Sequence, residues 1–297
     1  MVQLTIFTPV YNRSALLGRL YLSLLKQTVK NFEWVIVDDG SNDNIQVLVD
    51  QWINENTDFE IKFYLQINSG KHVAHNNGVR HSEGTYFVCV DSDDWLEPDA
   101  VEQIIADTSL CKGYEGLIYP KKTIGQEAHE KWFPSGVNRI TYSDMRMKYG
   151  IVRETAMVFN TETLKKHSFP VFEGEKFLPE GAMYYELDMN ERFIVRNKTI
   201  LVGKYLENGL TKNLYQNWLK NREGTIYALR SRFNASKHYL SVRSLAERIA
   251  TIANIQALNM ACKVSVNKDV PSGNLMSLVC LPFALLFKMT KFGNRHK

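Results

Sequence analysis

The chain has 297 residues, of which 44% are hydrophobic and 23% charged, and this composition excludes a disordered chain and allows a sizeable core. Its formal charge of +4 only weakly favours an anionic partner and does not choose between a nucleotide, a nucleic acid and an acidic membrane. The four cysteines are scattered, so no zinc knuckle or redox pair is expected and a reducing cytoplasm is the natural compartment.

Strand and helix patterns alternate through the first 110 residues. Apolar runs predict strands at residues 3–8, 33–37, 61–66 and 85–90, the first of them stopped by Pro9. Helical spacing of apolar residues follows from Ser14 onward and at 45–53, and a third helix is expected at 71–81. Four strands separated by three helices predict a mostly parallel sheet flanked by helices.

The alternation weakens after residue 110. Short apolar segments at 116–119 and 156–159 predict a mixed sheet with inserted loops. Residues 215–239 and 242–264 carry helical periodicity without an internal proline, which predicts a helical appendage beyond a boundary near residue 213. The aromatic and basic residues of 215–239 fit a core stripe with a solvated basic face better than a nucleic-acid surface, so no nucleic acid is expected as a partner.

The two ends of the chain bear on location. The start lacks a basic leader and a cleavage site, so the protein is expected to stay inside the cell. Residues 275–287 are almost entirely apolar and precede Lys288, Lys291, Arg295 and Lys297. Because this run is short for a membrane crossing and Pro282 interrupts it, we expect residues 275–297 to lie on the anionic inner face of the plasma membrane. Packing of the same segment on the protein's own core or on a partner is the alternative.

Two predicted strands end in clusters of acids. Residues 33–37 lead into Asp38-Asp39-Gly40-Ser41, and residues 85–90 lead into Asp91-Ser92-Asp93-Asp94. Loops at the carboxyl ends of neighbouring parallel strands share one crevice, where five carboxylates would repel one another without a cation or hydrogen-bond donors. The clusters therefore predict a metal and an anionic nucleotide, while turn formation and helix capping are the alternative for each one.

Four motifs, in this order and spacing, resemble the family 2 glycosyltransferases, which are inverting enzymes with the A-type nucleotide-diphospho-sugar transferase fold. They are Thr8-Pro9-Val10-Tyr11-Asn12-Arg13, residues 37–43, residues 70–78 and Asp91-Ser92-Asp93-Asp94. The resemblance implies an α/β glycosyltransferase domain at residues 1–213, with a nucleotide-binding half at 1–110 and an acceptor half at 111–213. The helical region at 214–297 would follow it.

The resemblance also implies roles for individual residues. Asp93 would bind Mn²⁺ or Mg²⁺, Asp91 would reach the ribose or the metal shell, and Asp39 would read the base. The other nucleotide-binding residues would be Thr8, Pro9, Tyr11, Arg13, Lys71 and Asn76. Family members often carry arginine at the position of His75, which could still donate to the base or ribose. A zinc site at His72 and His75 is not expected, because no third ligand accompanies them.

Inversion needs a carboxylate that takes the proton of the acceptor hydroxyl. The resemblance points to Glu180 as this base, although Gly181 stands where a second acid is usual, so Glu186 and Asp188 remain alternatives and Glu180 could instead cap the next helix. Lys212 lies in a segment that resembles a loop over the diphosphate; a solvated lysine is the other interpretation.

These observations predict a metal-dependent enzyme that moves a sugar from a UDP-sugar to a hydroxyl of a growing, lipid-linked cell-surface glycan. The alternatives are a nucleotidyltransferase and a sugar-nucleotide-binding scaffold without a catalytic base. The sequence does not name the sugar, the acceptor or the oligomeric state.

Overall fold

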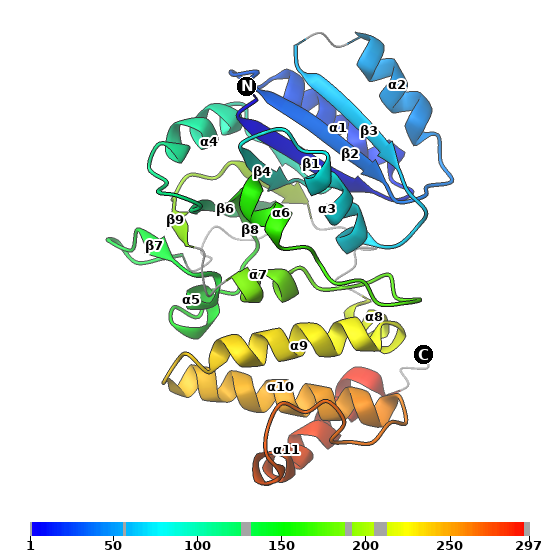
Figure 1. The fold of residues 1–297 in the computed structure, drawn as a ribbon, viewed down its shortest axis with the longest axis vertical. Helices are drawn as coiled ribbons and strands as arrows, with labels where there is room; N and C mark the ends of the chain where they lie inside the picture. Colours follow the sequence, from blue (N-terminus) through cyan, green and yellow to red (C-terminus); the bar gives the residue numbers. More distant parts are fainter. Residues whose placement is uncertain (1, 56–57, 126–131, 188–191, 205–212, 294–297) are drawn as a thin grey trace. The chain divides into compact units, whose positions relative to one another are not determined.

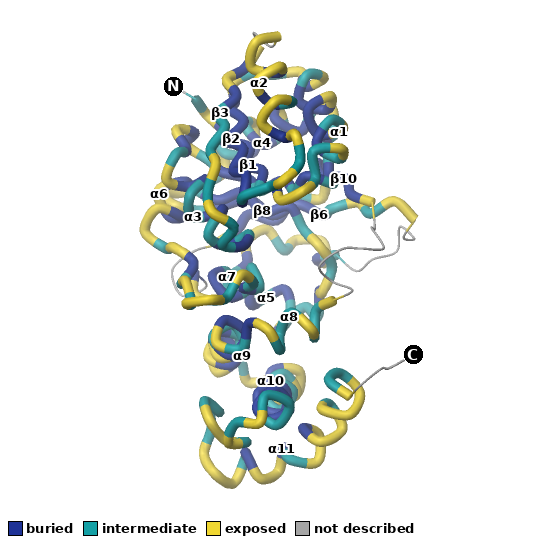
Figure 2. The backbone as a smooth tube through the Cα atoms, turned by 90° about the vertical axis from the view of Figure 1, so that its right-hand side faces the viewer, coloured by how far each residue is buried: buried dark blue, intermediate teal, exposed yellow. Residues whose placement is uncertain are grey.

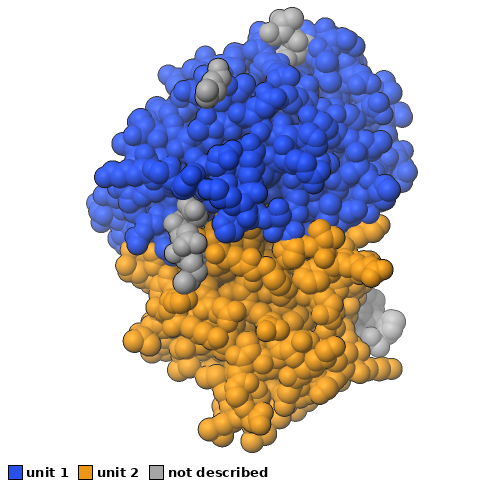
Figure 3. Space-filling view, viewed as in Figure 1, with its two compact units in different colours: residues 1–141, 151–169, 190–206 blue, residues 142–150, 170–189, 207–297 orange. Residues whose placement is uncertain are grey.

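The computed structural model forms two compact units, which Figure 3 colours separately. The structure describes residues 2–55, 58–125, 132–187, 192–204 and 213–293. Unit 1 comprises residues 1–141, 151–169 and 190–206, and unit 2 comprises residues 142–150, 170–189 and 207–297. Residues 142–150 and 170–189, which the sequence assigned to the first domain, therefore group with the C-terminal helices.

Unit 1 is built around one mixed sheet (Figure 1). Its strands are β1 (Leu4–Val10), β2 (Phe32–Asp38), β3 (Glu60–Leu65), β4 (Tyr86–Cys89), β5 (Trp95–Leu96), β6 (Gly116–Ile124), β7 (Arg139–Ile140), β8 (Thr155–Asn160), β9 (Phe193–Val195) and β10 (Leu201–Lys204). Its helices are α1 (Ser14–Leu25), α2 (Ile45–Glu55), α3 (Lys71–Arg80), α4 (Ala100–Thr108) and α6 (Thr161–Lys166).

The strand order is β3-β2-β1-β4-β8-β6-β10-β5, with β9 also paired to β6 and β7. The first four strands in this order are parallel, so the ends of β1, β2 and β4 lie at one edge. Strand β8 is antiparallel to both β4 and β6. The predicted α/β architecture and the mixed character of the second half are thus confirmed.

Both faces of the sheet are covered by apolar packing, and β1 and β2 are almost wholly buried (Figure 2). On one face, α1, α2 and α4 pack against alternate residues of the strands, with Trp34 at the centre. On the other face, α3 packs against β1, and Gly78 permits the contact because a Cβ there would lie 2.3 Å from the ring of Phe7. The prediction that Pro9 ends the first strand was wrong: β1 continues to Val10, since proline tolerates extended dihedrals and removes only one donor.

Unit 2 is helical. It contains α5 (Tyr142–Met147), α7 (Gly181–Leu187), α8 (Leu214–Lys220), α9 (Arg222–Ser236), α10 (Val242–Ala261), α11 (Asn274–Phe287) and the π-helical turn η1 (Lys288–Phe292). The predicted helix at 215–239 is two helices, because the chain turns at Asn221, whose side-chain oxygen accepts the backbone N–H groups of Lys176 and Phe177. The prediction that Pro282 interrupts the terminal apolar run was also wrong, since α11 passes through it.

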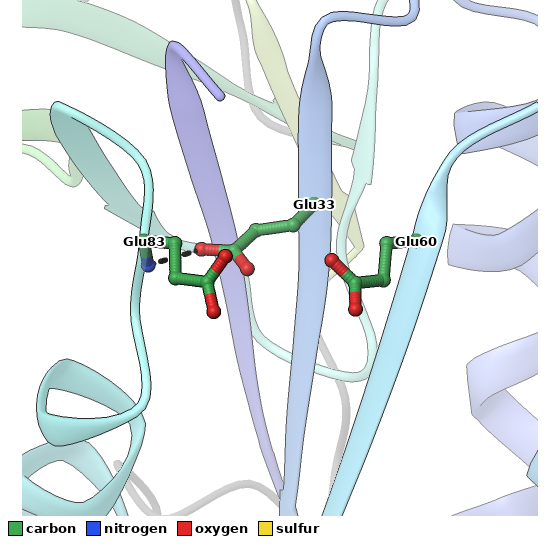
Figure 4. Close-up of side chains that lie close together, drawn as sticks. All are labelled: Glu33, Glu60 and Glu83. Carbon is green, nitrogen blue, oxygen red and sulfur yellow. Dashed lines mark hydrogen bonds between the residues drawn. The ribbon is translucent and has the colours of Figure 1, made fainter. Parts of the chain in front are cut away.

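At the amino ends of β2 and β3, three carboxylates lie close together (Figure 4). Glu33 is fully buried and accepts hydrogen bonds from the hydroxyl of Thr5 and the backbone of Glu83, at 2.5 and 2.6 Å. The ammonium of Lys62 lies 2.7 Å from Glu33, 2.9 Å from Glu83 and 3.4 Å from Glu60. Burial by itself would raise the pKa of Glu33, but Lys62 and the other donors hold it below its usual value. The group is therefore a structural ion-pair network whose cation is Lys62.

We expect Lys62→Met to lower the free energy of unfolding by about 3 kcal/mol, because it leaves the buried Glu33 carboxylate without its cation. Glu60→Gln is the matched control, since Glu60 is exposed and its loss should change stability by less than about 0.5 kcal/mol. Urea unfolding of both variants measures the difference. Equal effects of the two substitutions would show that the buried pair contributes no more than a surface one.

Candidate active site

The candidate site lies at the carboxyl edge of the unit 1 sheet, where the loops after β1, β2 and β4 meet. The backbone N–H of Asp39 donates to the carbonyl of Val10 at 2.8 Å, which joins the ends of β1 and β2. The backbone N–H of Val90 donates to the carbonyl of Phe7, also at 2.8 Å, which joins β1 to the segment entering the acidic turn. The two acid clusters of the sequence are thereby brought to one edge.

Asp39 organises the loop between β3 and α3. Its carboxylate accepts the backbone N–H groups of Ser69 and Gly70 at 2.7 and 2.8 Å and the side-chain amide of Gln66 at 2.8 Å. Gly70 has a φ of 95°, a conformation that a residue with a Cβ rarely adopts. One oxygen of this buried carboxylate receives only a single bond from the protein, which leaves one acceptor position of Asp39 unfilled.

The loops after β1 and β2 hold each other in place. Asn12, at a φ of 52°, donates its backbone N–H to the hydroxyl of Ser41 and accepts the backbone N–H of Asn42 on its side-chain oxygen. Asp43 accepts the backbone N–H of Ser14 at 2.8 Å and so caps the start of α1 from the neighbouring loop. These contacts hold the backbone on both sides of Arg13, at Asn12 and Ser14, and so fix the position from which the Arg13 side chain extends.

The turn after β4 carries three carboxylates, and each pairs with a cation from a different element. The guanidinium of Arg13 lies 3.1 Å from Asp93, and the ammonium of Lys71 lies 2.6 Å from Asp91. Burial would raise the pKa of Asp91, but Lys71, with Lys121 and Arg13, holds it below its usual value. Both carboxylates remain open to solvent, since the side chain of Asp91 is 40% exposed and that of Asp93 is 20% exposed.

Asp94, in contrast to Asp91 and Asp93, is buried. Lys121 of β6 lies 2.7 Å from Asp94 and 2.8 Å from Glu154. A Cβ on Gly203 of β10 would lie 2.3 Å from an oxygen of Asp94 and 2.6 Å from the Cε of Lys121, so only glycine leaves room for this pair. Burial and the carboxylates of Asp91 and Asp93 raise the pKa of Asp94 to about 7 despite Lys121. No local pattern in the sequence indicated Lys121, Glu154 or Gly203 as site residues.

The donor set fits a divalent cation of the Mg²⁺ or Mn²⁺ type. Asp91 and Asp93 present partly exposed carboxylate oxygens, which are the ligands such ions prefer. The two loops carry six carboxylates, Asp38, Asp39, Asp43, Asp91, Asp93 and Asp94, and ion pairs with Arg13, Lys71 and Lys121 reach three of them. Lys121 is shared with Glu154, so a bound divalent ion would offset part of the remaining negative charge. Among the described residues, the one group of three acids whose ligand atoms all lie within 4.8 Å of one another is Glu33, Glu60 and Glu83, and Lys62 already lies within it.

The predicted base-pocket residues differ in what they can offer. Tyr11 is 47% exposed and free to stack on a ring. Thr8 is fully buried and its hydroxyl accepts the indole N–H of Trp34 at 3.0 Å, so its side chain belongs to the core beneath α1. Asn76 exchanges two hydrogen bonds with the backbone of Phe169, at 2.8 and 2.9 Å, and thereby ties α3 to the segment after α6.

His75 does not offer a donor to a nucleotide. Its ring is buried and packs edge-on against Phe7, Phe87 and Phe169. Burial, helped by nearby Lys71, lowers the pKa of His75 to about 3, so the imidazole is neutral at physiological pH. The suggestion that it contacts the base or ribose was therefore wrong. No zinc-type group that includes His72 and His75 occurs in the part of the chain that the structure describes.

The predicted acceptor-side residues belong to unit 2. Glu180 directly precedes α7, and its carbonyl accepts the backbone N–H of Met183 at 3.2 Å. Glu186 lies on α7 and accepts hydrogen bonds from the hydroxyls of Tyr227 and Ser231 of α9. Asp188 and Lys212 lie outside the described residues.

Comparisons with known proteins agree with this geometry. Residues 5–160, just over half of the chain, match the family described as Glycosyl transferase family 2. Glycosyltransferase GlyA of Streptococcus pneumoniae serotype 4 is 25% identical over 268 residues, which cover 85% of this chain; the chain spans 35% of the length of that relative.

Two solved structures share the fold. S. aureus TarS 1–349, crystallised with UDP-GlcNAc, has a TM-score of 0.61 at 15% identity and covers 99% of this chain and 93% of its own. Glucosyl-3-phosphoglycerate synthase from Mycobacterium tuberculosis, crystallised with Mn²⁺, UDP and phosphoglyceric acid, has a TM-score of 0.53 at 14% identity. The match covers 77% of this chain and 78% of that one.

We expect Gly203→Ala to weaken the binding of UDP with Mn²⁺ several-fold and to lower the free energy of unfolding by about 1–3 kcal/mol, because the new methyl displaces the Asp94–Lys121 pair under the acidic turn. Gly18→Ala is the control. Its Cβ meets nothing within 4 Å inside α1, so it should stabilise the protein by about 0.5–1 kcal/mol. Calorimetry measures the affinity and urea unfolding measures the stability. Unchanged ligand affinity in Gly203→Ala would mean that the Asp94–Lys121 pair does not support ligand binding.

His75 makes stability depend on pH. The pKa of His75 in the folded protein lies below its unfolded value of about 6.5. Below pH 6.5 the unfolded chain therefore binds a proton at His75 that the folded protein does not bind, which favours unfolding. Relative to His75→Leu, the wild type should lose about 1.4 kcal/mol per pH unit below 6.5, or about 2 kcal/mol at pH 5. Urea unfolding at pH 7.5, 6 and 5 tests this. A difference between the two proteins that stays constant over this range would mean that His75 is protonated in place.

Proposed function

Because the chain belongs to glycosyl transferase family 2, we propose that it transfers a sugar from a nucleotide-diphospho-sugar, a UDP-sugar in particular, to a hydroxyl group of an acceptor. The observation that carries this proposal is the convergence of three loops at one sheet edge, where Arg13 and Lys71 pair with the carboxylates of Asp93 and Asp91. The UDP and UDP-GlcNAc complexes of proteins with the same fold support the choice of donor.

The base would be read in the loops after β1 and β2. Asp39 is already held by Ser69, Gly70 and Gln66 and keeps one acceptor position, which suits the N3 proton of uracil. Tyr11 is exposed beside this loop pair and would stack on the ring. Pro9 would line the pocket with its ring. The side chains of Thr8 and Asn76 are bonded within the protein, so these residues would contribute by holding the backbone around the pocket in place.

The diphosphate would lie over the turn after β4. Asp93 would hold a divalent cation there, with Asp91 as a second ligand or a partner of the ribose. When bound, that ion supplies positive charge against the phosphate oxygens as the bond to the sugar lengthens. Arg13 and Lys71 would then turn from the carboxylates to the phosphates, because the ion neutralises the acids and the phosphates offer new anionic partners.

In the transfer step, the acceptor oxygen forms a bond to the anomeric carbon as the bond from that carbon to the phosphate oxygen breaks. UDP leaves with the bonding electrons, and a carboxylate takes the acceptor proton. We assign this proton to Glu180, the residue that the family resemblance indicates as the base of an inverting transfer. Two observations support Glu180. It lies in the segment that resembles the family's acidic pair, and the alternative base Glu186 already accepts a hydrogen bond from Tyr227.

We further propose that the acceptor is a growing, lipid-linked saccharide of the cell envelope and that the enzyme works in the cytoplasm, on the inner face of the plasma membrane. The support is the apolar, basic segment 275–297, which would keep the enzyme near such an acceptor.

Incubation of the protein with a panel of nucleotide sugars and Mn²⁺ tests the proposed chemistry. We expect slow release of UDP from one UDP-sugar, loss of that release in Asp93→Asn, and an unchanged thermal midpoint in the variant. Asp50→Asn, an exposed carboxylate on α2, is the control and should release UDP like the wild type. Normal turnover by Asp93→Asn would contradict the metal assignment, and release of pyrophosphate would indicate a nucleotidyltransferase.

A second variant tests the base. Glu180→Gln should lower the rate of transfer by roughly 10²- to 10⁴-fold while the Kd for UDP stays within about twofold, because only proton removal is lost. Glu186→Gln serves for comparison and should retain most of the rate. If Glu180→Gln transfers sugar normally, the base lies elsewhere.

A further inference from the structure

The terminal helix of unit 2 packs with its small residues inward and its large residues outward. The buried positions of α11 are Ser277, Cys280 and Ala284. Seven large apolar side chains are exposed instead, from 49% for Phe283 to 78% for Leu275. We call these the outer face: Leu275, Leu278, Val279, Phe283, Leu285, Leu286 and Met289.

This arrangement is the reverse of what burial in a water-soluble helix produces. Residues spaced by three, four and seven along a helix share a side, so Leu275, Leu278, Val279 and Leu286 form one stripe. Figure 2 shows α11 as mostly exposed along its length. A contiguous apolar surface of this kind marks a site for a partner or a membrane.

The inner side of α11 is firmly attached to α10. Cys280 and Ala284 join a buried cluster with Phe233, Ile252 and Ala253. The amide of Gln256 donates to the carbonyl of Ser277 at 2.8 Å. The ammonium of Lys291 donates to Asn254 at 2.7 Å, so the helix is held at both ends.

We infer that the outer face of α11 and η1 docks on an anionic lipid bilayer and lies flat in its interfacial layer. The continuous helix from Asn274 to Phe292 has 19 residues and is long and apolar enough, by length and composition alone, to cross a membrane, contrary to the expectation from the shorter apolar run. A crossing would, however, carry α10 with it, and α10 bears Arg243, Glu247 and Arg248. An interfacial position keeps these charges in water while the outer face enters the apolar layer.

Charge favours a bilayer over a second copy of the chain. Residues 270–297 contain no aspartate or glutamate, whereas Lys288, Lys291, Arg295 and Lys297 follow the apolar run. Lys288 is exposed next to the outer face. Lys291 is already bonded to Asn254, but an anionic lipid surface offers partners to the other three cations. The same segment of a second copy would bring only further cations. This inference rests on the proposed membrane location of the enzyme and is independent of its chemistry.

Co-sedimentation of the full chain with vesicles tests the inference. The wild type should bind vesicles of phosphatidylcholine with 30% phosphatidylglycerol and bind pure phosphatidylcholine vesicles several-fold more weakly. Leu278→Glu combined with Leu286→Glu should weaken binding to the anionic vesicles by roughly tenfold or more, because two carboxylates then enter the apolar layer. Leu240→Glu is the matched control, since Leu240 is fully exposed in the same unit but lies outside α11, and it should bind like the wild type.

Phe283→Trp reports insertion directly. After subtraction of the wild-type emission, which comes from five tryptophans, its emission should shift to the blue when anionic vesicles are added, whereas that of Leu240→Trp should not respond. Failure of the wild type to bind, or equal binding by the double variant, would overturn the inference. A dimer that the double variant disrupts, in the absence of vesicle binding, would assign the face to a second copy. UDP binding, measured on the same proteins, tests the proposed function independently. Absence of UDP binding would count against that function but would not affect the inference about the outer face.

Discussion

The structure of the candidate site depends on one electrostatic constraint, which is the gathering of carboxylates at the carboxyl edge of a parallel sheet. Asp39 reaches this edge from β2, and Asp91 and Asp93 reach it after β4. Such acids repel one another, so the fold supplies Arg13 and Lys71 as partners from two other elements. Under the proposed function, an edge balanced in this way would exchange its cations for a metal ion and a diphosphate.

The protein contains a second acidic cluster at the other edge of the same sheet, and the two differ in how they are satisfied. Glu33 is fully buried, and Lys62 and several N–H and O–H donors occupy its acceptor positions. Asp91 and Asp93 are partly exposed and each holds one cation. A saturated, buried cluster stabilises the fold, whereas a partly satisfied, exposed one can bind a ligand.

Much of the fold could be predicted from local patterns, and the misses have physical reasons. Apolar runs and helical periodicity indicated the strands and helices of the first 110 residues because each pattern reports burial on one face. Pro9 and Pro282 were given too much weight, since a strand and a helix each tolerated the loss of one donor.

Of the site, the acids and two of their cationic partners, Arg13 and Lys71, were named from the sequence, whereas the residues around Asp94 were not. The spacing of Asp39, Asp91 and Asp93 after strands is visible in the sequence. Lys121 and Gly203 come from strands that are distant in the chain and carry no motif. His75 was misjudged because its place in the glycine segment suggested a ligand contact, whereas three phenylalanine rings surround it in the fold.

The most direct test of the account is a calorimetric titration of Mn²⁺ into the protein, alone and with saturating UDP. If the acidic turn holds the ion against the diphosphate, one Mn²⁺ binds per chain, and UDP raises the affinity for Mn²⁺ by at least about tenfold. Mn²⁺ then raises the affinity for UDP by the same factor. Equal affinity for UDP in Mn²⁺ and in a chelator would contradict the central claim.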